Sequence, residues 1–160
     1  MTAPTASGQV EIAAPADVVY DLITDLAAMA AVADETTTMR WRKGSSAAPG
    51  AVFTGVNRNG FRRWSTKCTV AEATPATRFT FDVKAAAGIP VARWQYDIET
   101  LPDGGCRVTE STWDHRPGWF RGPAGWATGS PDRTGANTTH IANTLRRLKQ
   151  RAESAAPQRG

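Results

Sequence analysis

The side chains that could move protons in a reaction are Tyr96, Glu110, Asp114, His115 and His140. Groups of these types act as general acids and bases when a fold holds them beside a reacting molecule. If the protein is an enzyme, we expect Tyr96, Glu110 and His115 to be its catalytic residues. The sequence contains no nucleophile elbow, phosphate loop, dinucleotide-binding turn or metal-binding helix. The chemistry that these residues suggest is therefore proton transfer, with neither a metal nor a cofactor.

The role of Glu110 depends on how two strands pair. If Trp113 lies opposite Trp94, Glu110 faces solvent. A shift by one residue turns Glu110 inward, because successive side chains of a strand point to opposite faces of the sheet. A carboxylate held in an apolar space has a raised pKa and becomes a credible acid or base. The sequence leaves both registers open.

The other candidates have plainer interpretations as well. Asp114 and His115 lie where the last strand enters a loop, a position at which side chains are commonly solvated. His140 lies to one side of the apolar stripe of the last helix, which indicates a hydrogen bond at the edge of the sheet. Tyr96 shares a face with Trp94, so we expect its hydroxyl to point into the space beneath that helix.

The elements that would position these groups follow from periodicity. Residues 9–12 are typical of a strand, residues 15–25 of a helix, and the Ala-rich residues 27–33 of a second short helix. From Thr36 to Trp113 apolar and polar residues alternate, which predicts six strands. Residues 134–154 have the period of a long amphipathic helix. This order predicts an α+β fold in which a curled antiparallel sheet of six to seven strands wraps around the terminal helix.

The dipeptide Asn59-Gly60 is the best hairpin signal, because it accepts the positive φ angles of a two-residue turn. We expect Arg58 to pair with Phe61 across this turn. Polar residues take alternate positions along the strands, so one face of the sheet should be wet and the other rich in aromatic rings. The expected inner face holds Met39, Trp41, Phe53, Trp64, Thr66, Cys68, Phe79, Phe81, Val83, Trp94, Tyr96 and Ile98.

One face of the predicted terminal helix changes character along its length. Its second half is apolar, as in a helix packed on a core, whereas its first half carries hydroxyls and an amide. Burying such groups without partners costs about 1–3 kcal/mol each, so we expect them to face a hydrated or ligand-filled space. Exposure to water and bonds to the backbone are the alternatives. The face comprises Thr134, Asn137, Thr138, Ile141, Thr144, Leu145, Leu148 and Ala152.

These patterns predict a pocket between the aromatic face and the terminal helix, because ligand pockets combine aromatic walls with a few polar groups. Its expected lining is Trp41, Phe53, Trp64, Phe81, Trp94, Tyr96, Trp113, Asn137, Thr138, Ile141, Thr144 and Leu145. The Gly- and Pro-rich segment 114–132 carries Trp119, Phe120 and Trp126. We expect these rings to form a lid at the mouth of the pocket or to pack over a sheet edge.

Composition narrows the class of protein. With 160 residues, 41% hydrophobic and 21% charged, the chain predicts a single domain, 1–160, with an ordered core of about 8–154. The cysteines lack metal-ligand spacing, and no apolar run reaches the roughly 20 residues of a membrane helix. The net charge of +4 is partly due to basic residues late in the last helix, where they suit its dipole, so nucleic-acid binding is not expected. No secretory signal is visible, so we expect a cytoplasmic monomer or homodimer.

The sequence resembles the superfamily that groups steroidogenic-regulatory-type lipid-transfer (START) domains, birch-pollen-type allergens and polyketide cyclase/dehydrase-like proteins, known as SRPBCC. The resemblance spans residues 10–151 and rests on VEIAAPADVVYDLITD, PGAVFTGVNRNG, RWQYDIE, GGCRVTES and NTLRRLKQ. The chain is most similar to short bacterial polyketide cyclase/dehydrase-like proteins. The resemblance implies the helix-grip fold, a bent antiparallel sheet around a long helix with a deep cavity between them. It carries over no active site, because these segments are signatures of a fold.

Three functions are expected on these grounds. The first is binding of a hydrophobic, ring-containing molecule, polyketide-, steroid- or lipid-like, under the last helix. The second is a cofactor-independent cyclase or dehydratase that folds a polyketide-like substrate in the same pocket and moves protons. The third is a lipid chaperone or transfer protein that docks through residues 119–126. An inward-facing Glu110 would favour chemistry, and a lining without ionisable groups would favour storage or transport.

Overall fold

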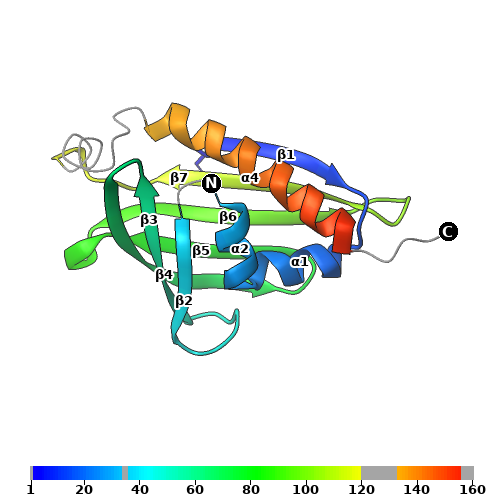
Figure 1. The fold of residues 1–160 in the computed structure, drawn as a ribbon, viewed down its shortest axis with the longest axis horizontal. Helices are drawn as coiled ribbons and strands as arrows, with labels where there is room; N and C mark the ends of the chain where they lie inside the picture. The colour runs from blue at the N-terminus through cyan, green and yellow to red at the C-terminus, as the bar shows by residue number, and fades with distance from the viewer. Residues whose placement is uncertain (1, 34–35, 120–132, 156–160) are drawn as a thin grey trace.

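The computed structural model describes residues 2–33, 36–119 and 133–155 (Figure 1). The elements of these residues are β1 (Ala6–Ile12), α1 (Ala16–Thr24), α2 (Leu26–Val32), β2 (Thr36–Lys43), β3 (Val52–Asn59), β4 (Arg62–Thr74), β5 (Arg78–Lys84), the 3-10 helix η1 (Ala86–Gly88), β6 (Pro90–Thr100), β7 (Cys106–Asp114) and α4 (Arg133–Ala155). The expected order of one strand, two short helices, six strands and a long terminal helix is confirmed.

The strands form one antiparallel sheet in the order β1-β7-β6-β5-β4-β3-β2. Figure 1 shows α4 lying across one face of this sheet alongside β1, with α1 and α2 on the same side. In this view β2 and β3 run across the direction of β6 and β7, because the sheet is strongly bent. A bent antiparallel sheet around a long terminal helix is the predicted α+β helix-grip architecture.

The two short helices are separated by a capping residue. Asp25 ends α1, and its side chain accepts hydrogen bonds from the backbone N–H groups of Ala27 and Ala28 at 3.0 and 3.2 Å, which begins α2. Such a cap contributes about 1 kcal/mol to a helix. In α1, Ala16, Val19, Tyr20 and Ile23 are buried, whereas Val18 and Leu22 are half-buried. Within the described residues no helix is long and apolar enough to cross a membrane.

The first strand is longer than predicted, since β1 begins at Ala6 rather than near Gln9. The N–H of Thr5 donates to the carbonyl of Thr112 at 2.8 Å, and the indole N–H of Trp113 donates to the carbonyl of Thr2 at 2.8 Å. The ordered part of the chain therefore begins before residue 8, where the ordered core was expected to start. Alternation was weak there because small and polar residues dominate, and pairing with β7 decides their structure.

The β3–β4 hairpin has a different register from the predicted one. Asn59 pairs with Arg62, so the turn is made by Gly60 and Phe61, and Arg58 does not pair with Phe61. Gly60 takes φ +64°, whereas Phe61 has no positive φ, which is typical of a type II′ turn with glycine first. The shift moves each pair by two positions, so the predicted inward residues keep their face.

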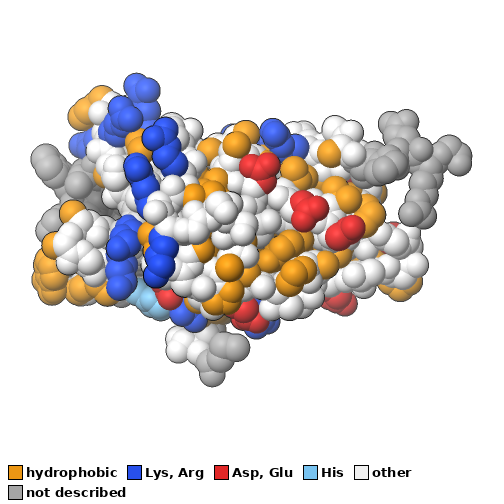
Figure 2. All heavy atoms as spheres, turned by 90° about the horizontal axis from the view of Figure 1, so that it is seen from below, with side chains coloured by type: hydrophobic (Ala, Val, Ile, Leu, Met, Phe, Trp, Pro, Cys, Tyr) orange, Lys and Arg blue, Asp and Glu red, His pale blue; other side chains and the backbone are white. Residues whose placement is uncertain are grey.

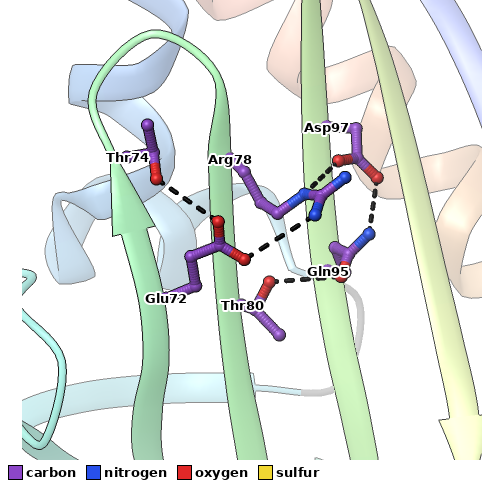
Figure 3. Close-up of polar contacts among 6 residues, drawn as sticks. All are labelled: Glu72, Thr74, Arg78, Thr80, Gln95 and Asp97. Atoms are coloured by element: carbon purple, nitrogen blue, oxygen red, sulfur yellow. Dashed lines mark hydrogen bonds and ion pairs between the residues drawn. The ribbon is translucent and has the colours of Figure 1, made fainter.

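Polar side chains cover the outer face of β4, β5 and β6, as predicted (Figure 3). Arg78 Nε lies 2.6 Å from a carboxylate oxygen of Asp97, and the amide of Gln95 donates to the other oxygen at 2.7 Å. Arg93 and Asp82 form a second, two-bonded pair at 2.7 and 2.9 Å. These groups are partly exposed, so each pair contributes only about 0–1 kcal/mol. Their alternation with inward rings still specifies which face of each strand is buried.

The second half of α4 packs directly on the sheet. Its residues Ile141, Leu145, Leu148 and Ala152 are at most 2% exposed. Gly8 of β1 makes the close approach possible, since a Cβ at this position would lie 2.8 Å from Cγ2 of Ile141. The core therefore fills the space under the C-terminal half of α4. A cavity can form only farther along the helix, toward its N-terminal half.

Candidate functional site

A cavity of about 160 Å³ lies between the inner face of the sheet and the first half of α4. Its described lining is Met29, Ala33, Thr36, Met39, Phe53, Gly55, Asn57, Trp64, Thr66, Cys68, Phe81, Val83, Val91, Trp94, Tyr96, Glu110, Asn137, His140 and Thr144. Most of these side chains are apolar, and a few polar groups lie among them. The interior is thus hollow, with the mixture of lining groups that binding sites for small molecules have.

The carboxyl of Glu110 belongs to this lining because of the register of β6 and β7. Tyr96 pairs with Glu110, and Trp94 pairs with Thr112. Of the two registers that the sequence allowed, the structure has the one that turns Glu110 inward. Both Tyr96 and Glu110 are 3% exposed, and the phenol O–H of Tyr96 donates to Oε1 of Glu110 at 2.7 Å. Two titratable groups therefore converge inside one cavity.

The second carboxyl oxygen of Glu110 is buried without a partner. Among the described residues no group makes a hydrogen bond to Oε2. Burial raises the pKa of Glu110 from 4.5 to about 8, and the hydrogen bond from Tyr96 opposes this shift only in part. Burial and the adjacent carboxyl raise the pKa of Tyr96 well above its usual 10. Near neutral pH the phenol is therefore protonated, while Glu110 can exchange a proton.

A chain of polar groups crosses the other side of the cavity. The hydroxyl of Thr36 donates to Oδ1 of Asn57 at 2.7 Å, and the amide of Asn57 donates to the hydroxyl of Thr66 at 3.1 Å. These residues belong to β2, β3 and β4. Gly55 of β3 also lines the cavity and lies opposite Thr66. Asn57 was missed as a site residue, although it stands at an inward position of a strand whose alternate residues were predicted to face inward.

The helix side of the cavity differs from the predicted face in three positions. Asn137 and Thr144 line the cavity, but Thr138 is exposed. Ile141 and Leu145 are buried in the core and are not among the lining residues. The helix is rotated so that its polar first half meets the cavity through a narrower stripe than a 100° projection indicates. The same rotation brings His140 to the lining instead of the sheet edge.

Five of the seven expected aromatic residues line the cavity: Phe53, Trp64, Phe81, Trp94 and Tyr96. Trp41 does not; its ring packs edge-on against Phe53 with centroids 5.5 Å apart. Trp113 is also outside the cavity, contrary to expectation. The register that turns Glu110 inward sends Trp113 to the opposite face, where it pairs with Arg93 and bonds to the N-terminal segment. Compared with the register that pairs Trp113 with Trp94, the observed register removes Trp113 from the lining and adds the carboxyl of Glu110.

The residues expected at the mouth are only partly described. His115 is exposed, and its backbone N–H donates to the carbonyl of Val91 at 2.9 Å. The side chain of His115 is not among the lining residues, so the cavity does not use it as expected. Trp119 is 69% exposed. Phe120 and Trp126, the other two rings of the expected lid, lie outside the described residues.

Cys68 also faces the cavity, as its strand position predicted, but its chemistry is suppressed. Burial raises the pKa of this thiol to about 12, and a side-chain contact with Thr66 offsets a small part of the effect. A thiol with such a pKa is not a nucleophile at neutral pH. Within the described residues no group of three or more His, Cys, Asp or Glu side chains could hold a metal ion. Acid–base chemistry by Glu110 is the reactivity that this geometry offers.

Comparison with known proteins assigns the class. A family model described as polyketide cyclase / dehydrase and lipid transport matches residues 3–153. The chain therefore belongs to this family, within the helix-grip superfamily that its sequence resembles. No curated protein matches the sequence.

Solved structures agree with the family. A polyketide-cyclase-like protein from Corynebacterium glutamicum is 26% identical, with 96% of this chain and 94% of that chain covered and a TM-score of 0.61. Ara h 8.0201 is 12% identical, with 92% of this chain and 96% of that chain covered and a TM-score of 0.67. The di-domain ARO/CYC StfQ of the steffimycin biosynthetic pathway is 11% identical with a TM-score of 0.69; 92% of this chain and 50% of that chain are covered. The last two likenesses concern the fold alone.

Proposed function

We propose that the protein binds a hydrophobic, ring-containing molecule with a carbonyl oxygen in the cavity between the sheet and α4. The observation that carries this proposal is the inward carboxyl of Glu110, held at Oε1 by Tyr96 and without a partner at Oε2 among the described residues. Polyketide-, steroid- and lipid-like molecules combine apolar rings or chains with such oxygens. The family description, polyketide cyclase / dehydrase and lipid transport, supports the same class of ligand.

The protonation state of Glu110 determines whether its carboxyl donates or accepts the hydrogen bond to the ligand. With a pKa of about 8, the group is mainly a neutral carboxylic acid at pH 7. Because Tyr96 donates to Oε1, the carboxyl proton is placed on Oε2, where a ligand oxygen can accept it. A buried polar atom without a partner costs about 1–3 kcal/mol. A ligand ketone at Oε2 would remove this cost, whereas a pure hydrocarbon would leave it.

The walls of the cavity suit the rest of such a ligand. Phe53 and Phe81 contact each other edge-on with ring centroids 5.3 Å apart, and Trp64 and Trp94 complete the lining with them. Aromatic rings of a ligand pack favourably against rings in this arrangement. The polar chain through Asn57 lies in the same lining and offers hydrogen bonds to a second ligand oxygen.

A second candidate function is proton-transfer catalysis in the same cavity, as in a cyclase or dehydratase. The observation that favours it is the convergence of Tyr96 and Glu110, with the Glu110 pKa near physiological pH. General acids and bases work best when their pKa lies close to the working pH. The lining also contains the imidazole of His140, a second side chain of a type that serves as an acid or base in catalysis.

The reaction would proceed by confinement of a chain that carries several carbonyls. The Glu110 carboxylate would take a proton from the carbon between two carbonyls, and the resulting enolate would attack a third carbonyl to form a carbon–carbon bond. The alkoxide so formed would take this proton back from Glu110 and become a hydroxyl. For dehydration, the Glu110 carboxylate would then remove the second proton of the attacking carbon, and the new enolate would expel the hydroxyl, which leaves as water with the proton from Glu110. Tyr96 would position the carboxyl throughout.

Binding of a matched ligand pair tests the first proposal. Acetylnaphthalene and ethylnaphthalene share their size and rings, but only the ketone accepts a hydrogen bond. Two pH units below the Glu110 pKa of about 8, the wild type should prefer the ketone by about tenfold. Two units above it, this preference should disappear. Glu110→Gln should keep the preference at both pH values, because an amide N–H replaces the carboxyl O–H, and the exposed Glu99→Gln is the control.

Equal affinity for the two ligands at every pH would overturn the carbonyl contact. Native mass spectrometry of the purified protein supplies an independent check, since a co-purified ligand should contain a carbonyl or a hydroxyl.

A turnover assay distinguishes binding from catalysis. If the protein is a cyclase, Glu110→Gln should still bind the ketone but fail to convert a linear poly-ketone. Absence of conversion by the wild type would leave binding as the function and reject catalysis.

A further inference from the structure

An exposed phenylalanine stands at the tip of the β3–β4 hairpin. Phe61 is 86% exposed and occupies the second position of the two-residue turn. The guanidinium of Arg62 lies 4.7 Å from the centroid of its ring. Arg58 and Arg63 face each other across the strands directly behind the turn, and the Nε of Arg58 donates to the carbonyl of Gly60 at 3.0 Å. We call these four residues, Arg58, Phe61, Arg62 and Arg63, the cationic tip.

The segment around the cationic tip carries positive charges only. Residues 36–71 contain seven basic residues and no Asp or Glu, so they carry +7, whereas the whole chain carries +4 and the remainder therefore −3. The register places Lys67 opposite Lys84, and Arg58 opposite Arg63. Like charges in cross-strand pairs destabilise a sheet. Figure 2 shows Lys and Arg side chains gathered at the same end of the molecule, at the left of the view. An anionic partner would offset this repulsion.

The cationic tip lies at the cavity end of the molecule. Asn57 and Trp64, which pair with each other just behind Arg58 and Arg63, line the cavity. Val83 and Val91, on either side of the β5–β6 turn, line it as well. In Figure 1 the β3–β4 turn, the β5–β6 turn and the end of β7 all lie at the left end of the long axis. A surface that contacts the tip is therefore adjacent to the ligand cavity.

We propose that the cationic tip docks on a bilayer that contains anionic phospholipids. Phe61 enters the boundary between headgroups and acyl chains, and Arg58 and Arg63 bind phosphates at either side of a surface hollow lined by both arginines, Phe61 and Thr37. Apolar rings and basic side chains together give this kind of interfacial binding. A nucleic acid fits less well, because the outward positions of the strands behind the tip are Thr, Val, Ser, Arg and Lys, with no ring for base stacking.

Sedimentation of the full-length protein with vesicles tests the proposal. Vesicles of phosphatidylcholine alone are compared with vesicles in which about one third of the lipid is phosphatidylglycerol. The wild type should bind only the anionic vesicles, and added salt should weaken the binding. Arg58→Gln with Arg63→Gln should lower the partition coefficient about 30-fold, since each basic residue near such a surface contributes about tenfold or less. Phe61→Ser should lower it about tenfold.

Matched controls keep the test specific. Arg146→Gln with Arg151→Gln removes two exposed charges from α4, and Leu101→Ser changes an apolar residue in the β6–β7 turn at the other end of the molecule. Both should retain wild-type binding. Failure of the wild type to bind anionic vesicles, or equal losses in the control variants, would overturn the proposal. So would binding of a short DNA duplex that requires Arg58 and Arg63 while vesicles are ignored. Ketone affinity in solution should be unchanged by the tip variants, which separates this proposal from that of the cavity.

Discussion

Tyr96 and Glu110 are direct partners across β6 and β7, and their side chains meet at 2.7 Å inside the cavity. The pairing joins a phenol that stays protonated to a carboxyl whose pKa lies near physiological pH. Because both groups are held by the same two strands, their geometry is set by the sheet rather than by a loop. A site on rigid strands positions a proton more accurately than a site on a flexible segment.

The stability of the protein should fall as pH rises from about 5 to 8. The pKa of Glu110 is raised from 4.5 to about 8 in the folded state, so in this window the folded chain binds more protons than the unfolded chain. The contribution of Glu110 is present in full below pH 4.5 and is lost as pH rises through the folded pKa, at roughly 1 kcal/mol per pH unit. Urea unfolding at a series of pH values measures it. Glu110→Gln should lack this slope, and an identical pH profile of the variant would contradict the buried carboxyl.

Tyr96→Phe should raise the pKa of Glu110 above its value of about 8, because the hydrogen bond from the phenol is what lowers it. It should also destabilise the fold by about 1–3 kcal/mol, since Oε1 then loses its partner. A carbon-13 NMR titration of the Glu110 carboxyl measures the pKa. Tyr20→Phe removes the other tyrosine hydroxyl of the chain and should leave this pKa unchanged. A lower pKa in Tyr96→Phe would exclude the proposed direction of the bond.

Trp94→Ala should weaken acetylnaphthalene binding about tenfold or more while the fold is retained, because one wall of the cavity is lost. Trp113→Ala is the matched control, since Trp113 lies outside the cavity and bonds to the carbonyl of Thr2. Calorimetric titration gives the affinities, and circular dichroism checks the fold. Equal losses in the two variants would show that the aromatic lining is assigned to the wrong residues.

Gly8→Ala should destabilise the protein by about 1–3 kcal/mol. The new Cβ would lie 2.8 Å from Cγ2 of Ile141, a side chain that is 1% exposed and has little room to move. Thermal or urea unfolding measures the loss. Gly118→Ala, with no atom of the described residues within 4 Å of the new Cβ, should change stability much less. If both variants were as stable as the wild type, α4 would not pack on β1 this closely.

Both cysteines should resist alkylation in the folded protein. Cys68 is 5% exposed with a pKa of about 12, and Cys106 is 0% exposed with a pKa raised by burial. Iodoacetamide near pH 8 should therefore modify neither thiol until a denaturant is added, and mass spectrometry counts the adducts. Rapid modification of Cys68 without denaturant would contradict the raised pKa of this thiol.

The order of elements could be predicted because it depends on local patterns. Alternation of apolar and polar residues specifies strands, and the stripe on residues 134–154 specifies an amphipathic helix. The inward positions of β3 to β6 also followed from alternation, and Phe53, Trp64, Phe81, Trp94 and Tyr96 all line the cavity. These predictions needed only the period of each segment.

The register of the strands and the rotation of α4 about its axis could not be predicted from the sequence. The hairpin shifted by two positions without consequence for its faces, because the side-chain period is two. In β7 a shift of one position was decisive, since it brought Glu110 into the cavity and sent Trp113 outward. The rotation of α4 likewise left Thr138 exposed and brought His140 to the lining.

By itself the sequence determined a bent sheet around a terminal helix, with an aromatic inner face and hydroxyls above it. Only the tertiary structure decided that a carboxyl and a phenol meet in the space between. The physical reason is that alternation sets which residues share a face, while pairing between distant strands sets which face is inward. The register of β7 is set by its pairing with β1 and β6. β1 lies far from Glu110 in the chain, and β6 is separated from it by the β6–β7 turn.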